Sequence, residues 1–224
     1  MSNLQIHQFP CLSDNFGVLI HDPVTKWSAA INVKLALKAA TGCTIIGPKA
    51  EAQRIPGIDK SVGQGDSFAF GNFKVEVLDT PGHTAGHITY YIPAAKVAFA
   101  GDTLFAVGCG RVIEGDMRMM WNSLKKLIAL PADTVVYCGH EYTQSNIKFA
   151  LTIEPGNAAL QKRAAEVDAL RVAGKPTLPT TMALELATNP FLRVASPEIQ
   201  ERLGMQGRDD WEIFGEIRER KNRG

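Results

Sequence analysis

Apolar and polar positions divide the chain into two parts with different periodicity. In the first part, short apolar runs, several with alternating polar positions, lie between glycine, proline and asparagine residues, which predicts β-strands. From about residue 143 onward, apolar residues recur at helical spacing between proline and glycine breaks. The pattern predicts an α/β domain over 1–147 and a helical domain over 148–224.

The predicted elements follow from local periodicity and from the residues that interrupt it. The first long helix shows this best, because Met120, Leu124 and Leu127 fall on one face of residues 117–130. The predicted strands cover 4–7, 17–21, 27–31, 43–46, 67–70, 73–78, 88–92, 96–100 and 134–138. The predicted helices cover 33–40, 49–54, 117–130, 143–151, 157–173, 181–187, 197–203 and 209–220.

Composition narrows the class of protein. A chain of 224 residues with 45% hydrophobic residues can form one ordinary core with an extension. The net charge of +1 gives no reason to expect nucleic acid or an anionic membrane as a partner. No apolar run approaches the ~20 residues of a membrane span, and no signal peptide opens the chain. The four cysteines form no CxxC pair, so we expect reduced thiols in a cytoplasmic protein.

Three predicted strands are each followed by a glycine and then a side chain that binds metals. These side chains are His83, Asp102 and His140. Glycine allows a sharp turn and a close approach of the backbone to a ligand, and ligands bind at the carboxyl edge of α/β sheets. Two imidazoles and a carboxylate at this edge predict a site for a metal such as zinc.

A metal with an open position makes a hydroxide nucleophile available at neutral pH, which suits hydrolysis of an ester, thioester or amide. A serine nucleophile has little support, because no GxSxG elbow is present. A cysteine nucleophile could use Cys138 near His140. Cys138 lies in an apolar run, however, which favours a place in the core.

Several motifs together resemble glyoxalase II, a family of the metallo-β-lactamase superfamily. The resemblance spans nearly the whole chain, including the closing helices. The motifs are Cys11-Leu12-Ser13-Asp14-Asn15-Phe16, Pro81-Gly82-His83-Thr84-Ala85-Gly86-His87, Gly101-Asp102-Thr103-Leu104-Phe105, Gly108-Cys109-Gly110-Arg111 and Cys138-Gly139-His140-Glu141-Tyr142-Thr143.

The resemblance implies a fold, an activity and a metal site. The fold would be an α/β, metallo-β-lactamase-type αβ/βα four-layer sandwich with a C-terminal helical domain. The activity would be hydrolysis of S-lactoylglutathione-type thioesters to glutathione and a 2-hydroxy acid. The site would contain two divalent metals (zinc, iron or manganese), with His83 on one, His140 on the other and Asp102 bridging them. His87 is not a ligand in the family, which suggests a supporting role.

The resemblance also implies a binding site for the glutathione moiety, formed by Arg111, Tyr142, Arg218 and Lys221. A second interpretation applies to the last two residues, because basic side chains near a helix C-terminus are favourable without any ligand. The expected partner is a small-molecule glutathione thioester, with no nucleic acid and no membrane. The chain departs from the family at Ile113, where some relatives have a tyrosine that contacts glutathione.

One family motif is absent. The family has a run of histidines with an aspartate that supplies four metal ligands, whereas this chain has only five histidines, none in such a run. The break lies between Ile31 and Asn32, where a helix, a core strand and the histidine loop, roughly 30 residues of a βαβ-like unit, would be missing. With these ligands missing, we expect weak metal binding, and the chain would hold two metals, one or none. The missing strand would leave strand edges unpaired, which favours self-association or strand exchange over the monomer of the family. Two hypotheses result: a metal-dependent thioester hydrolase, or a non-catalytic deletion derivative that keeps the scaffold.

Overall fold

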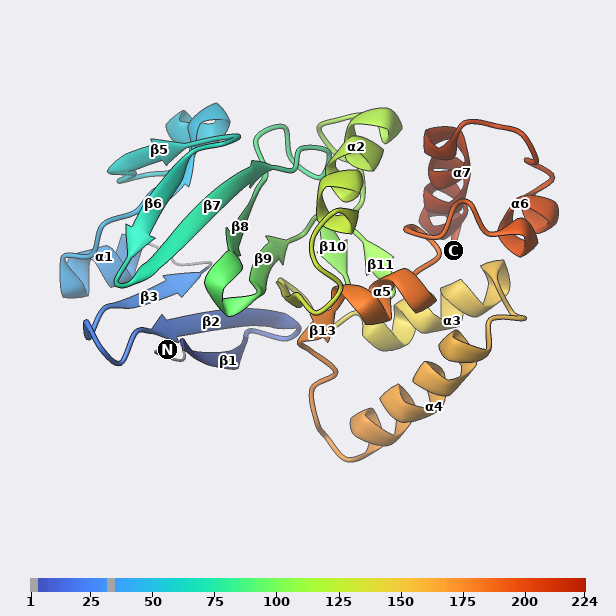
Figure 1. The fold of residues 1–224 in the computed structure, drawn as a ribbon, viewed down its shortest axis with the longest axis horizontal. Helices are drawn as coiled ribbons and strands as arrows, with labels where there is room; N and C mark the ends of the chain where they lie inside the picture. Colours follow the sequence, from blue (N-terminus) through green and yellow to red (C-terminus); the bar gives the residue numbers. More distant parts are fainter. Residues whose placement is uncertain (1–3, 32–34) are drawn as a thin grey trace.

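The structure is a computed structural model that describes residues 4–31 and 35–224. Most of the β-strands lie at one end of the molecule, and most of the helices lie at the other (Figure 1). Within the described ranges, no helix is long and apolar enough to cross a bilayer.

The larger sheet has six strands in the order β13-β12-β9-β8-β7-β6. Strands β9 and β12 run parallel, and Cys138 lies opposite Gly101 at their carboxyl ends. The loops that carry Asp102 and His140 therefore leave the sheet side by side. The other neighbours are antiparallel. The strands are β6 (Ser67–Phe70), β7 (Phe73–Asp79), β8 (Ile88–Ile92), β9 (Val97–Gly101), β12 (Val135–Cys138) and β13 (Thr180–Thr181).

The N-terminal strands form a smaller antiparallel sheet that packs on the larger one. Strand β2 alternates, so that Val18 and Ile20 are buried among residues such as Val75 and Phe99 while Leu19 stays exposed. A separate parallel pair, β4 and β5, follows helix α1. The elements are β1 (Gln5–Cys11), β2 (Asn15–His21), β3 (Ser28–Ile31), α1 (Leu35–Thr41), β4 (Ile46–Pro48), the 3-10 helix η1 (Lys49–Arg54) and β5 (Lys60–Val62).

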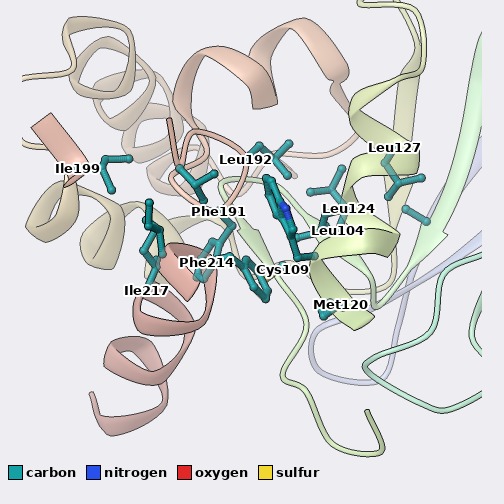
Figure 2. Packing of buried hydrophobic residues seen from close by; sticks show 14 of the residues in the cluster. Leu104, Cys109, Met120, Leu124, Leu127, Phe191, Leu192, Ile199, Phe214 and Ile217 are labelled. Atoms are coloured by element: carbon teal, nitrogen blue, oxygen red, sulfur yellow. The ribbon is translucent and has the colours of Figure 1, made fainter. Parts of the chain in front are cut away.

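The helical end has its own apolar core. Phe191 and Phe214 are fully buried, and they pack with residues of α2 such as Met120 and Leu124 (Figure 2). Helix α2 begins at a cap formed by Asp116, whose side chain accepts a hydrogen bond from the Met119 N–H. The elements are β10 (Leu104–Phe105), β11 (Gly108–Cys109), α2 (Met117–Ile128), α3 (Thr143–Ile153), α4 (Ala158–Val172), α5 (Met182–Thr188), α6 (Pro197–Leu203) and α7 (Asp210–Arg223). The 3-10 helix η2 (Pro93–Ala95) belongs to the larger sheet, where it connects β8 to β9.

A buried ion pair connects the helices to the sheet end. Arg163 of α4 donates to Glu185 of α5 across 2.7 Å, and both side chains are almost fully buried. The other oxygen of Glu185 accepts the Val107 N–H at 2.8 Å. Val107 sits between β10 and β11 with φ of 55°, an unusual conformation for a β-branched residue. The helices thus fix the loop that precedes Arg111.

Most predicted elements are confirmed within one or two residues at their ends, including the long helix α2 and the hairpin β6–β7. The strand predicted at 43–46 is wrong in position, because β4 covers Ile46–Pro48. Residues 49–54 form a 3-10 helix, and residues 33 and 34 of the predicted helix 33–40 lie outside the described residues. Strands β5, β10, β11 and β13 were not predicted, because two or three residues are too few to show a period.

A cavity separates β3 from β4. It has a volume of ≈ 900 Å³ and is lined on one side by β3 and on the other by residues of β4 and the segment before it. Across residues 4–31 and 35–224, no strand pairs with the outer edge of β3 or of β4. The expected break between Ile31 and Asn32 adjoins this cavity at Ile31, whereas Asn32 lies outside the described residues.

Candidate active site

Asp102 occupies the turn directly after β9, and glycine makes that turn possible. Gly101 has φ of +50°, in the left-handed region that favours glycine. A Cβ atom at Gly139 would lie 2.5 Å from the Asp102 carboxylate, and one at Gly110 would lie 2.0 Å from the Asp102 carbonyl oxygen. Side chains at either position would displace Asp102, so these glycines allow three loops to converge.

The structure brings His83, Asp102 and His140 together. The Nε2 atom of His83 lies 3.5 Å from one carboxylate oxygen of Asp102. The Nε2 atom of His140 lies 3.5 Å from the other. Asp102 therefore stands between the two imidazoles and presents one oxygen to each.

Hydrogen bonds determine which ring nitrogens carry protons. The Nδ1 atom of His83 lies 2.9 Å from the Arg111 carbonyl oxygen, and a carbonyl only accepts, so Nδ1–H donates. The Nδ1 atom of His140 lies 3.2 Å from a carboxylate oxygen of Asp14, which likewise only accepts, and this contact is shorter than the one of 3.4 Å to the Asn15 amide nitrogen, which would donate. In their neutral forms both histidines consequently direct an Nε2 lone pair at Asp102.

Lone pairs that face a carboxylate repel it, and a cation bound between them removes that repulsion. A separation of 3.5 Å is long for a hydrogen bond but close to the distance of about 3.4 Å between two ligands of one tetrahedral zinc, given bonds of ~2.0–2.1 Å. A backbone carbonyl or carboxylate on the far nitrogen is also the usual support of a metal-bound histidine. The donors that are present therefore suit a divalent cation.

The donor count is nevertheless low. Each position beside Asp102 has one imidazole and one carboxylate oxygen. Among the residues described, no three His, Cys, Asp or Glu side chains converge on one point as a metal would require. Stable metal sites in proteins have three or four protein ligands, so this arrangement provides two incomplete positions.

His87 supports Asp102 from behind. Its Nε2 atom accepts the Asp102 N–H at 3.1 Å, and its Nδ1 atom lies 2.9 Å from the Thr103 hydroxyl, which itself donates to the Thr80 carbonyl oxygen. Desolvation by the surrounding protein lowers the pKa of His87 to about 4, even though the Asp102 carboxylate opposes this shift. The neutral ring remains an acceptor that fixes the backbone of Asp102.

Two of the predicted glutathione-binding residues lie at the rim of this cluster. The Tyr142 ring stacks on His140 with a centroid distance of 4.7 Å and meets the edge of Phe105 at 5.3 Å. Arg111 is exposed, and its carbonyl oxygen orients His83. Tyr142 thus contacts a candidate metal ligand through its ring, and Arg111 does so through its backbone.

The other predicted pair lies behind β11. Arg218 is 3% exposed, donates to the Cys109 carbonyl oxygen at 2.9 Å and covers the Phe191 ring. The Lys221 ammonium lies 5.0 Å from the centre of the Phe149 ring. Burial first, and then repulsion by Arg218, lower the pKa of Lys221 to about 8. Both cations lie next to Cys109, two residues before Arg111.

Asp14 and Asn15 are site residues that the sequence analysis did not identify. Asp14 orients His140, and the Asn15 amide nitrogen lies 3.4 Å from the same Nδ1 atom. These residues are more than a hundred positions from His140, so no local pattern signals the contact. The only sequence signal was the resemblance of residues 11–16.

Cys138 is buried, as expected, and burial raises the pKa of its thiol to about 12, which argues against a role as nucleophile.

Comparisons with known proteins agree with this geometry. Residues 14–140 match the sequence profile of the metallo-beta-lactamase superfamily, and residues 141–224 match that of the hydroxyacylglutathione hydrolase C-terminus. The hydroxyacylglutathione hydrolases of Brucella anthropi and Brucella ovis are each 51% identical over 251 residues, which covers 98% of this chain and 96% or 98% of theirs. That alignment is longer than the 224-residue chain, so the relatives contain residues that have no counterpart in it.

Solved structures share the fold. ETHE1 from Myxococcus xanthus has a TM-score of 0.68 at 23% identity, covering 97% of this chain and 91% of its own. A metallo-beta-lactamase from Staphylococcus aureus has a TM-score of 0.63 at 16% identity, covering 96% and 73%. These likenesses confirm the predicted metallo-β-lactamase-type α/β fold. With the sequence matches over both parts of the chain, they show that this protein belongs to the hydroxyacylglutathione hydrolase family of the metallo-β-lactamase superfamily.

Proposed function

We propose that this protein hydrolyses a hydroxyacylglutathione thioester to glutathione and a 2-hydroxy acid. The observation that carries the proposal is the 51% identity to hydroxyacylglutathione hydrolases over 98% of the chain. It includes the helical part, which matches the C-terminus specific to that family. The substrate is a soluble, anionic small molecule, which is in keeping with a chain that has free thiols and would work in the cytoplasm.

A divalent metal belongs to this proposal, with zinc, iron and manganese as the candidates. His83 and His140 would each bind one side of the site, and Asp102 would bridge. When bound, such a metal lowers the pKa of a bound water towards ~7 and polarises a carbonyl oxygen. Because each position has one imidazole and one carboxylate oxygen, we expect loose binding that requires excess metal.

The residues of this chain orient the site and bind the substrate. The Arg111 carbonyl and the Asp14 carboxylate keep both Nε2 atoms directed at the site, and the His87 ring fixes Asp102. We assign the glutathione moiety to Arg111, Tyr142, Arg218 and Lys221, since glutathione has two carboxylates and these residues supply three cations and a phenol near β11. We also propose that residues 1–147 and 148–224 are the two domains, with substrate between them.

The direct test is an assay of S-lactoylglutathione hydrolysis by the purified full chain with zinc, iron(II) or manganese in excess. We expect metal-dependent hydrolysis that Asp102→Asn abolishes, because the variant loses the anion common to both positions. The matched control is Asp133→Asn, a carboxylate in an exposed ion pair with Lys96, which should retain activity. Absence of metal-dependent hydrolysis would contradict the proposal.

The low donor count favours a second candidate, a non-catalytic derivative that keeps the scaffold and the glutathione-binding residues. This candidate predicts no hydrolysis at any metal concentration together with metal-independent binding of glutathione. Calorimetry with glutathione in the presence of a chelator would measure that binding. Loss of the binding in Lys221→Met would assign it to the proposed residues.

A further inference from the structure

We propose that the cavity between β3 and β4 is a binding site for an extended apolar segment of another polypeptide, which adds a β-strand between these two edges. The cavity adjoins the candidate metal ligands His83 and Asp102 at one end, but the proposal does not depend on whether the chain hydrolyses a thioester. Three observations support it: two open strand edges, a cavity of matching volume, and relatives with additional residues.

Among the described strands, an edge without a partner strand borders the cavity on each side. β3 is the last strand of the smaller sheet, and β4 is paired only with β5 among the described strands. The Ile45 carbonyl oxygen accepts the Lys60 N–H and so faces β5. The next carbonyl, that of Ile46, therefore faces away from β5, and it accepts a hydrogen bond of 3.0 Å from the Tyr90 hydroxyl. A side chain from the larger sheet thus occupies a position where a neighbouring strand would donate.

The cavity volume corresponds to one strand. A strand advances about 3.3 Å per residue, lies about 4.8 Å from its neighbours and occupies a layer about 10 Å thick, which gives about 160 Å³ per residue. The cavity of ≈ 900 Å³ therefore accommodates a strand of about five or six residues. This is the usual length of a strand.

The lining defines the chemistry of the occupant. Apolar side chains on both sides of the cavity are only partly buried, including those of Ala30, Ile31, Ile45 and Ile46. A bound strand would bury them. Phe68 and Phe99 of the larger sheet form the floor. At one end the lining becomes polar, with Glu51 and Asp102 supplying carboxylates. The occupant is accordingly an aliphatic segment with hydrogen-bond donors at one end.

The described strands are all placed elsewhere, so the occupant comes from another chain. The Brucella relatives align over 251 residues, more than this chain contains, so homologous proteins carry a stretch that this chain lacks. Addition of a strand to an open edge is an established mode of peptide recognition. A second copy of this chain is the competing occupant, and the experiment distinguishes the two.

The test is calorimetry of the full chain with a synthetic peptide that carries the residues of the Brucella anthropi relative without a counterpart here. We expect saturable binding, together with slower amide hydrogen exchange in both β3 and β4. Ala30→Phe, which fills the cavity, should weaken binding by about tenfold or more. Val172→Phe is the matched control, because Val172 is 90% exposed at the far end of α4. The affinity of this variant for the peptide should equal that of the unmodified chain.

Several outcomes would overturn the proposal. These are no binding at about 1 mM peptide, equal binding by a scrambled peptide, or exchange that slows elsewhere but not in β3 and β4. Sedimentation of the chain alone as a dimer with β3 and β4 already protected would assign the cavity to a second copy instead. The exchange measurement uses the unmodified chain, so it decides the question even where Ala30→Phe fails to fold.

Discussion

The two ends of this molecule differ in how completely their elements are covered. At the helical end, the side chains of Phe191, Phe214 and Leu124 are fully buried in one core, and even the polar pair Arg163–Glu185 is enclosed and paired. At the sheet end, β3 and β4 have open edges beside a cavity of ≈ 900 Å³. The site lies where the two ends meet, on the loops after β7, β9 and β12.

This difference explains which parts of the site are intact. The loops that carry His83, Asp102 and His140 depend on the larger sheet and on the helices, which are fully packed. The open edges lie on the other side, where His83 and Asp102 line the cavity. Among the described residues, the candidate ligands therefore come from the loops of the larger sheet, and β3 and β4 supply no His, Cys, Asp or Glu to the cluster. The geometry of individual side chains can thus be retained where neighbouring strands have open edges.

The largest expected effect comes from truncating the closed core. Phe214→Ala should lower the free energy of unfolding by about 3–5 kcal/mol, because it leaves a cavity among rigid neighbours. Ile46→Ala, at the partly exposed edge of β4, should cost about 1 kcal/mol or less, since little contact is lost there. Urea unfolding followed by circular dichroism measures both. Equal costs would mean that the two ends are packed alike.

The buried ion pair gives an effect of similar size. Glu185→Gln leaves the Arg163 guanidinium enclosed without a carboxylate, which should lower the free energy of unfolding by about 3–5 kcal/mol. Removing the exposed Asp133 carboxylate by Asp133→Asn should have no measurable effect. If the Glu185→Gln variant is as stable as the unmodified chain, solvent must reach the Arg163 guanidinium.

A further effect is a pH dependence at Lys221. Its pKa of about 8 in the folded protein lies below its ordinary value of 10.5, so the unfolded chain binds more protons between these pH values. The free energy of unfolding should therefore rise as the pH increases from 8 to 10.5, and Lys221→Met should remove this component of the rise. Urea midpoints across this range measure it. If the contribution of Lys221 to the free energy of unfolding instead falls as the pH rises, burial does not lower the pKa of its ammonium group.

Local patterns predicted the fold class and singled out three side chains that the structure brings together, because His83, Asp102 and His140 each follow a strand and a glycine. The same patterns could not give the contact of Asp14 with His140, which joins residues 126 positions apart. They also misplaced β4, whose position depends on pairing with β5 rather than on its own periodicity. The break after Ile31 was predicted only through the resemblance, since neither neighbouring segment is unusual in itself.

The most direct test of the account is the metal content of the purified chain after incubation with zinc and removal of free metal by gel filtration. Positions with one imidazole and one carboxylate oxygen each should retain less than about one equivalent per chain. Asp102→Asn should retain none. Retention of about two equivalents by the unmodified chain would contradict the account. It would mean that ligands outside this cluster complete the site.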